Sequence, residues 1–266
     1  MLYEVKTYPL WQDIADSPAI HAFIPHNRAS DCAIAILPGG AYYFRAEHEG
    51  KGYAEFFAKN GILSFVIDYR CYTSKFPSPL LDARRGVQFI RHHAKEFGIK
   101  SDKIALMGSS AGGHLAALTA TYREELYLQE HQIDALDTTS YRPDAQILCY
   151  PVIKLFGKGI AHVGSGKNLL GEQYADLAED LTPDLIATSD TPPAFIWHTF
   201  SDEAVHVINS LDYARRLREY KVPTELHIFP EGSHGLGLCK GEDPVSLHNA
   251  QWTELLLNWL NFNHFV

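Results

Sequence analysis

The sequence is poor in cysteine, and its few cysteines form no recognisable framework. The 266 residues include four, Cys32, Cys71, Cys149 and Cys239, with no Cys-x-x-Cys pair among them. Scattered cysteines of this kind do not make a disulfide scaffold. We expect all four to be reduced, with Cys32 and Cys149 as small side chains in buried strands. A reducing compartment, and therefore the cytoplasm, is the expected location.

Long apolar runs and an excess of positive charge are also missing. No apolar stretch approaches the roughly 20 residues that a helix needs to span a bilayer. Residues 1–8 lack the basic and apolar regions of a signal peptide. The net charge of −9 argues against a nucleic-acid or anionic-membrane surface. We therefore expect no membrane or nucleic-acid partner, whereas the oligomeric state stays open.

The composition is that of a globular protein, with 46% hydrophobic and 21% charged residues. A chain of this length can bury one large core, and we expect a single domain over residues 1–266. Apolar runs predict buried strands at 32–37, 62–68, 103–107, 146–150, 194–198 and 224–229. Helices are predicted between them, at 50–60, 80–97, 111–122 and 207–221, with a closing amphipathic helix at 245–262. Segments 3–8 and 19–24 are candidate antiparallel edge strands.

This alternation predicts an α/β fold, a doubly wound and mostly parallel sheet of about eight strands with helices on both faces. Residues 153–193 interrupt the alternation because glycines and prolines are frequent there. We expect loops and short helices in this insertion. It either forms a lid or pocket wall over a site or is a plain long connection, although loops of this length are commonly functional.

The most informative motif is Gly108-Ser109-Ser110-Ala111-Gly112. It follows a predicted strand and precedes a predicted helix, which is the context of a Gly-x-Ser-x-Gly nucleophile elbow. Glycines on both flanks remove the Cβ atoms that would clash in so tight a turn. The motif predicts Ser110 as the nucleophile of an acyl-transfer reaction.

A nucleophilic serine needs a general base and an acid that orients it. Asp202 follows the strand 194–198 and His234 follows the strand 224–229, so both lie at the carboxyl ends of strands, where α/β sites are built. Their order after Ser110 is the order expected for this kind of elbow. Glu203 is the competing acid, and Asp190 is a poor one because it precedes its strand. His198 and His206 are predicted to be structural.

Backbone N–H groups that stabilise a developing oxyanion are the remaining requirement. The N–H of Ala111 and the glycine pair Gly39-Gly40, in the loop after the strand 32–37, are the predicted donors. Candidate substrate contacts are Tyr42, Tyr43 and His114. Core packing is the alternative for these residues and the preferred interpretation for Phe44, and a packing role is favoured for His114.

Three segments and the acid loop together resemble the α/β-hydrolase superfamily, and within it the group of small acetyl esterases, xylan esterases and lipase-like proteins. The segments are Pro38-Gly39-Gly40-Ala41-Tyr42, residues 108–114 (Gly-Ser-Ser-Ala-Gly-Gly-His) and residues 229–235 (Phe-Pro-Glu-Gly-Ser-His-Gly). Ala41 departs from the pattern, since many relatives have a third glycine there. The resemblance implies a short acyl group, plausibly acetyl on sugars, and a small-molecule ester as the partner.

The sequence thus predicts a serine carboxylic-ester hydrolase that acts through an acyl-enzyme, with no cofactor and no metal. The alternatives are an arylformamidase-like amide hydrolase, a serine peptidase of the prolyl-oligopeptidase type, and a non-catalytic binding module of the same fold. The peptidase is disfavoured because the chain has no room for a large additional domain. The binding module is disfavoured because every member of the triad is present in order.

Overall fold

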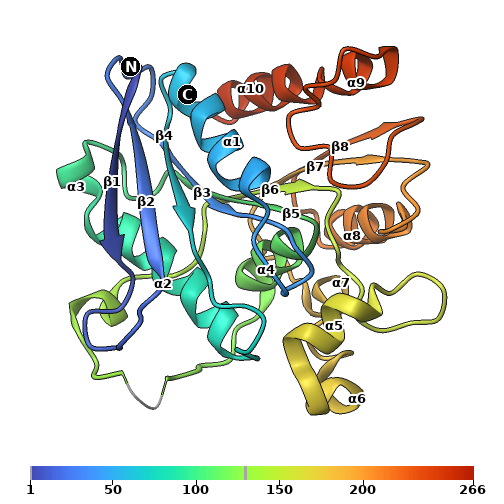
Figure 1. Ribbon diagram of the computed structural model, residues 1–266, viewed down its shortest axis with the longest axis horizontal. Coiled ribbons are helices and arrows are strands. Elements are labelled where there is room, and N and C mark those ends of the chain that lie inside the picture. Colours follow the sequence, from blue (N-terminus) through green and yellow to red (C-terminus); the bar gives the residue numbers. More distant parts are fainter. Residues whose placement is uncertain (1, 129–130) are drawn as a thin grey trace.

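The computed structural model describes residues 2–128 and 131–266 and is built around one eight-stranded sheet (Figure 1). The strands lie in the order β1-β2-β4-β3-β5-β6-β7-β8. β2 pairs antiparallel with β1 and β4, and all other neighbours are parallel. The bounds are β1 Tyr3–Pro9, β2 Ala19–Pro25, β3 Ala33–Leu37, β4 Leu63–Ile67, β5 Ile104–Ser109, β6 Ala145–Cys149, β7 Ala194–Thr199 and β8 Thr224–Phe229. The predicted fold class is confirmed.

Two hydrophobic cores cover the two faces of the sheet. One contains side chains of α1 (Glu47–Lys59) and α10 (Trp252–Phe262). The other contains side chains of α2 (Ser78–His92), α4 (Ser110–Thr121) and α8 (Ile208–Glu219). Every residue of β3, β4, β5, β6 and β7 is buried. Strands covered on both faces are mostly apolar, with Ser64, Gln146 and His198 among the buried exceptions, and this is why the apolar runs located them to within two residues.

Two helices predicted as continuous are interrupted. The segment 80–97 forms α2 and a short α3 (Ala94–Phe97), which Gly98 ends in a left-handed conformation. The segment 245–262 forms α9 (Pro244–Asn249) and α10. Long-range hydrogen bonds accompany the second break: the Asn249 amide donates to the Glu231 carbonyl, and the Trp252 indole donates to the Gly237 carbonyl. These bonds attach both helices to the loop that carries His234.

The insertion between β6 and β7 contains short helices, as predicted. They are α5 (Val163–Leu170), η2 (Gly171–Gln173), α6 (Tyr174–Leu177) and α7 (Pro183–Ile186), and another short helix, η1 (Ala135–Thr138), precedes β6. Figure 1 shows α5 and α6 at the periphery, well away from the sheet. The Asn168 side-chain amide donates to the carbonyl of Ala41 at 2.8 Å. The insertion is therefore attached to the loop that follows β3.

All four cysteines are free thiols, and Cys32 and Cys149 are buried in the core. None of the helices in residues 2–128 and 131–266 is both long and apolar enough to cross a membrane.

Candidate active site

The turn between β5 and α4 holds Ser110 in a left-handed backbone conformation. Its φ of +52° is uncommon for a residue with a Cβ and indicates local strain. A Cβ on Gly108 would lie 2.0 Å from the carbonyl oxygen of Gly112, and one on Gly112 would lie 2.1 Å from that of Leu37. Only glycine fits at these two positions. Since Ser110 begins α4, its side chain lies beside the free N–H groups and the positive dipole end of that helix.

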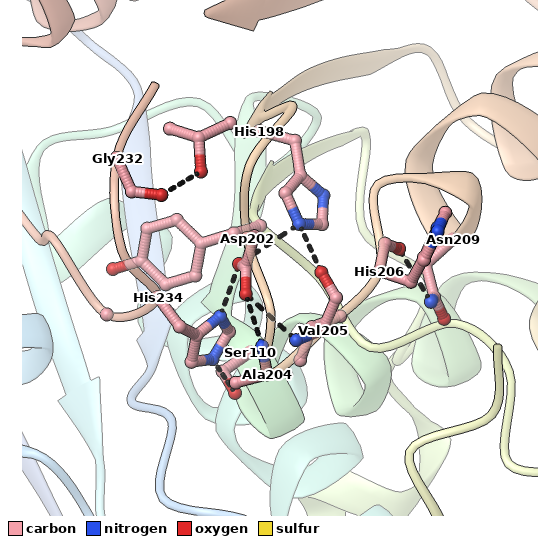
Figure 2. A network of polar contacts seen from close by, with 12 residues as sticks. Ser110, His198, Asp202, Ala204, Val205, His206, Asn209, Gly232 and His234 are labelled. Carbon is pink, nitrogen blue, oxygen red and sulfur yellow. Dashed lines mark hydrogen bonds and ion pairs between the residues drawn. The ribbon is translucent and has the colours of Figure 1, made fainter. Parts of the chain in front are cut away.

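The ring of His234 lies between Ser110 and Asp202 (Figure 2). Its Nε2 is 2.8 Å from Ser110 Oγ, and its Nδ1 is 2.6 Å from Asp202 Oδ2. The Tyr150 ring packs edge-on against it, with centroids 5.1 Å apart. A carboxylate beside Nδ1 favours the proton on that nitrogen and leaves Nε2 free to accept from the serine hydroxyl. The structure thus brings together the three residues that the sequence selected as nucleophile, base and acid.

Asp202 is buried, and four hydrogen-bond donors surround its carboxylate. Oδ1 accepts the backbone N–H groups of Ala204 and Val205, both at 2.9 Å. Oδ2 accepts from His234 and, at 3.2 Å, from His198. Burial alone would raise the pKa of this carboxyl, but the hydrogen bonds from His198 and His234 outweigh that effect and hold the pKa well below its usual range. Asp202 therefore remains a carboxylate beside the His234 ring.

His198 is fully buried and supports the acid. Its Nε2 lies 2.9 Å from the Val205 carbonyl as well as near Asp202, and its Nδ1 lies 2.8 Å from Ser210 Oγ. Two acceptors at Nε2 assign the proton to that nitrogen, so that Nδ1 accepts from the Ser210 hydroxyl. The sequence predicted a structural histidine here but held no signal for this contact. The competing acid, Glu203, is exposed.

The predicted oxyanion loop, residues 38–42 after β3, differs from the prediction at one residue. The Gly39 N–H donates to the buried carboxylate of Glu49, 2.8 Å from Oε2, so the prediction of Gly39 as an oxyanion donor is wrong. The Gly40 N–H makes no hydrogen bond within the described part of the chain. Ala111 lies in the first turn of α4, where an N–H has no partner within the helix. Gly40 and Ala111 therefore remain the candidate donors.

Tyr42 and His114 are buried in the core, which agrees with the packing role favoured for His114 and with the packing alternative for Tyr42, and leaves neither side chain exposed to a substrate. The Tyr42 side chain is 1% exposed and that of His114 is 0% exposed. The Tyr42 hydroxyl donates to His114 Nδ1 at 2.7 Å, and His114 Nε2 donates to the Leu181 carbonyl at 2.8 Å. Burial lowers the pKa of His114 to about 4. The pair links the oxyanion loop to α4 through the core.

Tyr43 and Phe44 lie on the surface, 55% and 57% exposed. Both backbone N–H groups donate to the Gly40 carbonyl, in a tight turn that directs the chain outward. Core packing was therefore the wrong prediction for Phe44. The Tyr43 ring packs edge-on against Tyr72, with centroids 4.8 Å apart. Tyr43 stays a predicted substrate contact.

His162, in the insertion, is a residue that the sequence did not single out. It precedes α5, and its Nδ1 accepts from the backbone N–H and the hydroxyl of Ser165, at 3.2 and 2.8 Å. Burial lowers its pKa, and the nearby charge of His234 lowers it further. The insertion therefore contributes a partly buried histidine whose hydrogen bonds lie within its own segment. Whether it acts as a lid or a pocket wall stays a prediction.

A hollow of about 870 Å³ adjoins His234. Its lining includes the hydroxyls of Ser201 and Ser233 and the carboxylates of Glu203 and Glu231. A second cavity, of about 490 Å³, lies behind the oxyanion loop and is lined by Pro38 and Phe44 but not by Ser110 or His234. The first hollow therefore adjoins His234, whereas Ser110 and Asp202 are not among the residues that line it.

One group of side chains in the described residues has the spacing of metal ligands: His131, Asp134 and Asp137. Their donor atoms already have partners. His131 contacts Asp13 through Nδ1 and Asp137 through Nε2, while Asp134 pairs with Arg85. The group is a surface ion-pair network that stabilises its own loop.

The chain is similar in sequence to one protein family and to several known proteins. The BD-FAE family model matches residues 21–217. Endo-1,4-beta-xylanase B of Butyrivibrio fibrisolvens is 34% identical over 232 residues, which cover 85% of this chain and 35% of that protein. Acetylxylan esterase of Xylanibacter ruminicola is 32% identical over 221 residues, covering 81% of this chain and 43% of that protein. The chain thus spans less than half the length of these two relatives.

Solved structures match over nearly their whole length. An acetyl ester-xyloside bifunctional hydrolase from Caldicellulosiruptor lactoaceticus has a TM-score of 0.89 and 37% identity, covering 98% of this chain and 97% of that one. The carboxylesterase Cest-2923 from Lactobacillus plantarum has a TM-score of 0.82 and 25% identity, covering 100% and 99%. The chain therefore belongs to the BD-FAE family, within the carboxylic ester hydrolases of the α/β-hydrolase fold.

Proposed function

We propose that this chain is a serine esterase in which Ser110 is the nucleophile, His234 the general base and Asp202 the orienting acid. The observation that carries the proposal is the pair of short contacts, 2.8 Å from Ser110 Oγ to His234 Nε2 and 2.6 Å from His234 Nδ1 to Asp202 Oδ2. A serine hydroxyl becomes an effective nucleophile when such a base takes its proton.

In the acylation step, Ser110 Oγ attacks the ester carbonyl carbon as its proton moves to His234 Nε2. The carbonyl electron pair moves to oxygen, and the N–H groups of Gly40 and Ala111 stabilise the resulting oxyanion. Asp202 stabilises the imidazolium that forms. The tetrahedral intermediate then collapses, the bond to the leaving oxygen breaks, and His234 gives its proton to the leaving alcohol.

In the deacylation step, water attacks the acyl carbon of the acyl-enzyme while His234 takes the proton of that water. The second tetrahedral intermediate expels Ser110 Oγ, which recovers its proton from the imidazolium. The products are the carboxylic acid and the free enzyme, so the cycle uses no redox partner and no metal step.

The proposed substrates are esters with a short acyl group, with acetylated sugars as the leading class. Two relatives support this choice by name, the acetylxylan esterase and the acetyl ester-xyloside hydrolase. The hollow beside His234 adds support, because residues with hydroxyl and carboxylate groups, Ser201, Ser233, Glu203 and Glu231, are among those that line it. Such groups hydrogen-bond to a hydroxyl-rich leaving group.

Fluorophosphonate labelling tests the nucleophile. The wild-type protein and a Ser109→Ala variant are expected to be labelled, and peptide mapping should locate the adduct on Ser110. A Ser110→Ala variant should be neither labelled nor active, since removal of a whole triad lowers kcat by about 10⁶-fold in a serine protease. Labelling or wild-type turnover in folded Ser110→Ala protein would disprove the assignment.

A substrate panel tests the acyl group. Nitrophenyl esters of two to twelve carbons, acetylated xylose and an aryl formamide would be compared by kcat/KM. The proposal expects the highest values for acetyl and propionyl esters and measurable release of acetate from the sugar. A preference for long chains would refute the short-acyl proposal, and a preference for the formamide would favour an amide hydrolase.

A further inference from the structure

A buried carboxylate lies directly behind the oxyanion loop. Glu49, in the first turn of α1, is 2% exposed. Among the described residues its one ion-pair contact is His48 Nε2, 3.8 Å from Oε1. A buried carboxylate is costly unless hydrogen bonds satisfy it. Here the Gly39 N–H donates to Oε2 at 2.8 Å and the Tyr150 hydroxyl donates to Oε1 at 2.7 Å. The positive end of the α1 dipole adds to this stabilisation.

The two hydrogen bonds of Gly39 constrain the peptide units on either side of it. The Gly39 N–H is held by Glu49, and the Gly39 carbonyl accepts from the Ala46 N–H at 2.9 Å. In a trans peptide the carbonyl and the following N–H point in opposite directions. Because the Gly39 carbonyl is directed at Ala46, at the start of α1, the Gly40 N–H points away from α1, while Glu49 holds the preceding peptide unit in place through the Gly39 N–H. The Gly40 N–H is the loop's candidate oxyanion donor.

The packing around Gly39 leaves the loop little freedom to shift. A Cβ added at Gly39 would lie 2.5 Å from Glu49 Oε2 and 3.0 Å from Ser110 Cβ. The loop is thus sandwiched between the carboxylate and the nucleophile. A displaced Glu49 would open a space into which Gly39 could move.

The second oxygen of Glu49 links the oxyanion loop to the loop that carries His234. The Tyr150 hydroxyl, which donates to Oε1, accepts from the Gly237 N–H at 2.9 Å, and the Tyr150 ring packs against His234. The neighbouring His48 side chain contacts the Gly235 carbonyl at 2.9 Å. The N-terminal end of α1 therefore contacts both the oxyanion loop and the loop that carries His234, and the proposed mechanism requires a fixed distance between these two loops.

We propose that Glu49 is a positioning residue for the oxyanion hole. Its carboxylate holds the Gly39 N–H so that the Gly40 N–H stays aimed at the oxyanion, and through Tyr150 it keeps that donor in register with His234. The inference rests on the proposed esterase mechanism. It assigns a role in the reaction to a side chain that does not touch the substrate.

Two substitutions separate positioning from simple packing. Glu49→Met fills similar space but offers Gly39 no strong acceptor, and Glu49→Gln keeps a neutral acceptor. Loss of one oxyanion donor costs about 10²-fold or more in kcat, so we expect a decrease of that size for Glu49→Met with KM little changed. A neutral hydrogen bond is weaker than a charge-assisted one, so Glu49→Gln should lose only about fivefold.

Inhibition by phenylboronic acid supplies the second readout, because it forms a tetrahedral anionic adduct with a nucleophilic serine. Its affinity should fall in parallel with kcat in both variants. Ser64→Ala is the matched control: the Ser64 hydroxyl is buried and bonds the Ala54 carbonyl of α1 at 3.3 Å, without contact to the oxyanion loop. This control should lower the melting temperature but keep kcat and boronate affinity.

A folded Glu49→Met protein with wild-type kcat and boronate affinity would overturn the proposal, even if its melting temperature fell. Should Glu49→Met fail to fold by circular dichroism, Glu49→Gln decides, and wild-type values in that variant overturn the proposal equally. Failure of the esterase mechanism itself is distinguishable, because Ser110→Ala protein would then still turn over substrate.

Discussion

Replacing Asp202 by asparagine is a sharp test of the triad, because every acceptor position of this carboxylate is in use. Two backbone N–H groups, from Ala204 and Val205, point at Oδ1, and two imidazole N–H groups, from His234 and His198, point at Oδ2. An asparagine side chain offers one accepting oxygen and one donating NH₂ group. Its oxygen can therefore accept from only one of the two pairs of N–H donors. The relative energies of the two amide orientations determine which pair keeps its acceptor.

With its oxygen toward the histidines, the new amide would point its NH₂ group at two backbone N–H groups. Each buried N–H left without an acceptor costs about 1–3 kcal/mol, so this orientation loses roughly 2–6 kcal/mol in total. With the amide reversed, the backbone N–H groups keep their acceptor, and His198 still donates to the Val205 carbonyl. His234 then accepts from the NH₂ group through Nδ1 and carries its proton on Nε2. The reversed orientation is the cheaper one.

A proton on Nε2 removes the base, because that nitrogen is the one that must accept from Ser110. We therefore expect Asp202→Asn to fold with an unfolding free energy within about 2 kcal/mol of wild type and to lose about 10⁴-fold in kcat, the size found for this change in a serine protease triad. The assays are nitrophenyl acetate turnover, urea unfolding, and ¹⁵N NMR of the His234 ring to assign its tautomer.

The matched control for this variant is Asp190→Asn, which changes the other candidate acid next to β7. Asp190 is exposed, and its side chain makes no hydrogen bond within the described residues, so the control should keep wild-type kcat. An Asp202→Asn protein within tenfold of wild-type kcat would refute the assignment of Asp202. So would a His234 ring that keeps its proton on Nδ1 in this variant.

Two further predictions concern stability and the nucleophile turn. His114 has a pKa near 4 in the folded protein against its usual 6.5. As the pH falls below 6.5, the unfolded chain therefore binds a proton at His114 before the folded protein does. This difference lowers the free energy of unfolding by up to about 3 kcal/mol between pH 6.5 and 4. Urea unfolding at pH 7 and 4.5 should show a smaller loss for His114→Gln than for wild type, and equal losses would contradict the prediction. Gly112→Ala places a Cβ 2.1 Å from the Leu37 carbonyl and should lower kcat at least about 10²-fold, as expected for a displacement of about 1 Å. The control is Gly52→Ala, whose added Cβ meets no atom within 4 Å. It should keep wild-type kcat and add about 0.5–1 kcal/mol to the free energy of unfolding. A Gly112→Ala protein with wild-type kcat would contradict the prediction, because the turn would then accommodate the methyl group.

The sequence by itself determined the features that depend on local patterns. A strand covered on both faces is mostly apolar, so runs such as those in β3 and β5 were recognisable and their bounds nearly correct. The elbow was recognisable because its requirement for glycine is contained within five consecutive residues. Asp202 and His234 could be selected because each follows a strand whose carboxyl end lies at the same edge of a parallel sheet.

The tertiary structure alone decided which groups those loops make available. Nothing near Gly39 in the sequence indicates that Glu49, ten residues later, takes its N–H. The inward direction of Tyr42 depends on its contact with His114, 72 residues away. Hydrogen bonds between segments distant in sequence have no local pattern, because their partners are set by how helices pack on the sheet. The succession of strands along the chain thus located the candidate site. The packing of α1 and α4 determined which backbone N–H groups are left as candidates to stabilise an oxyanion.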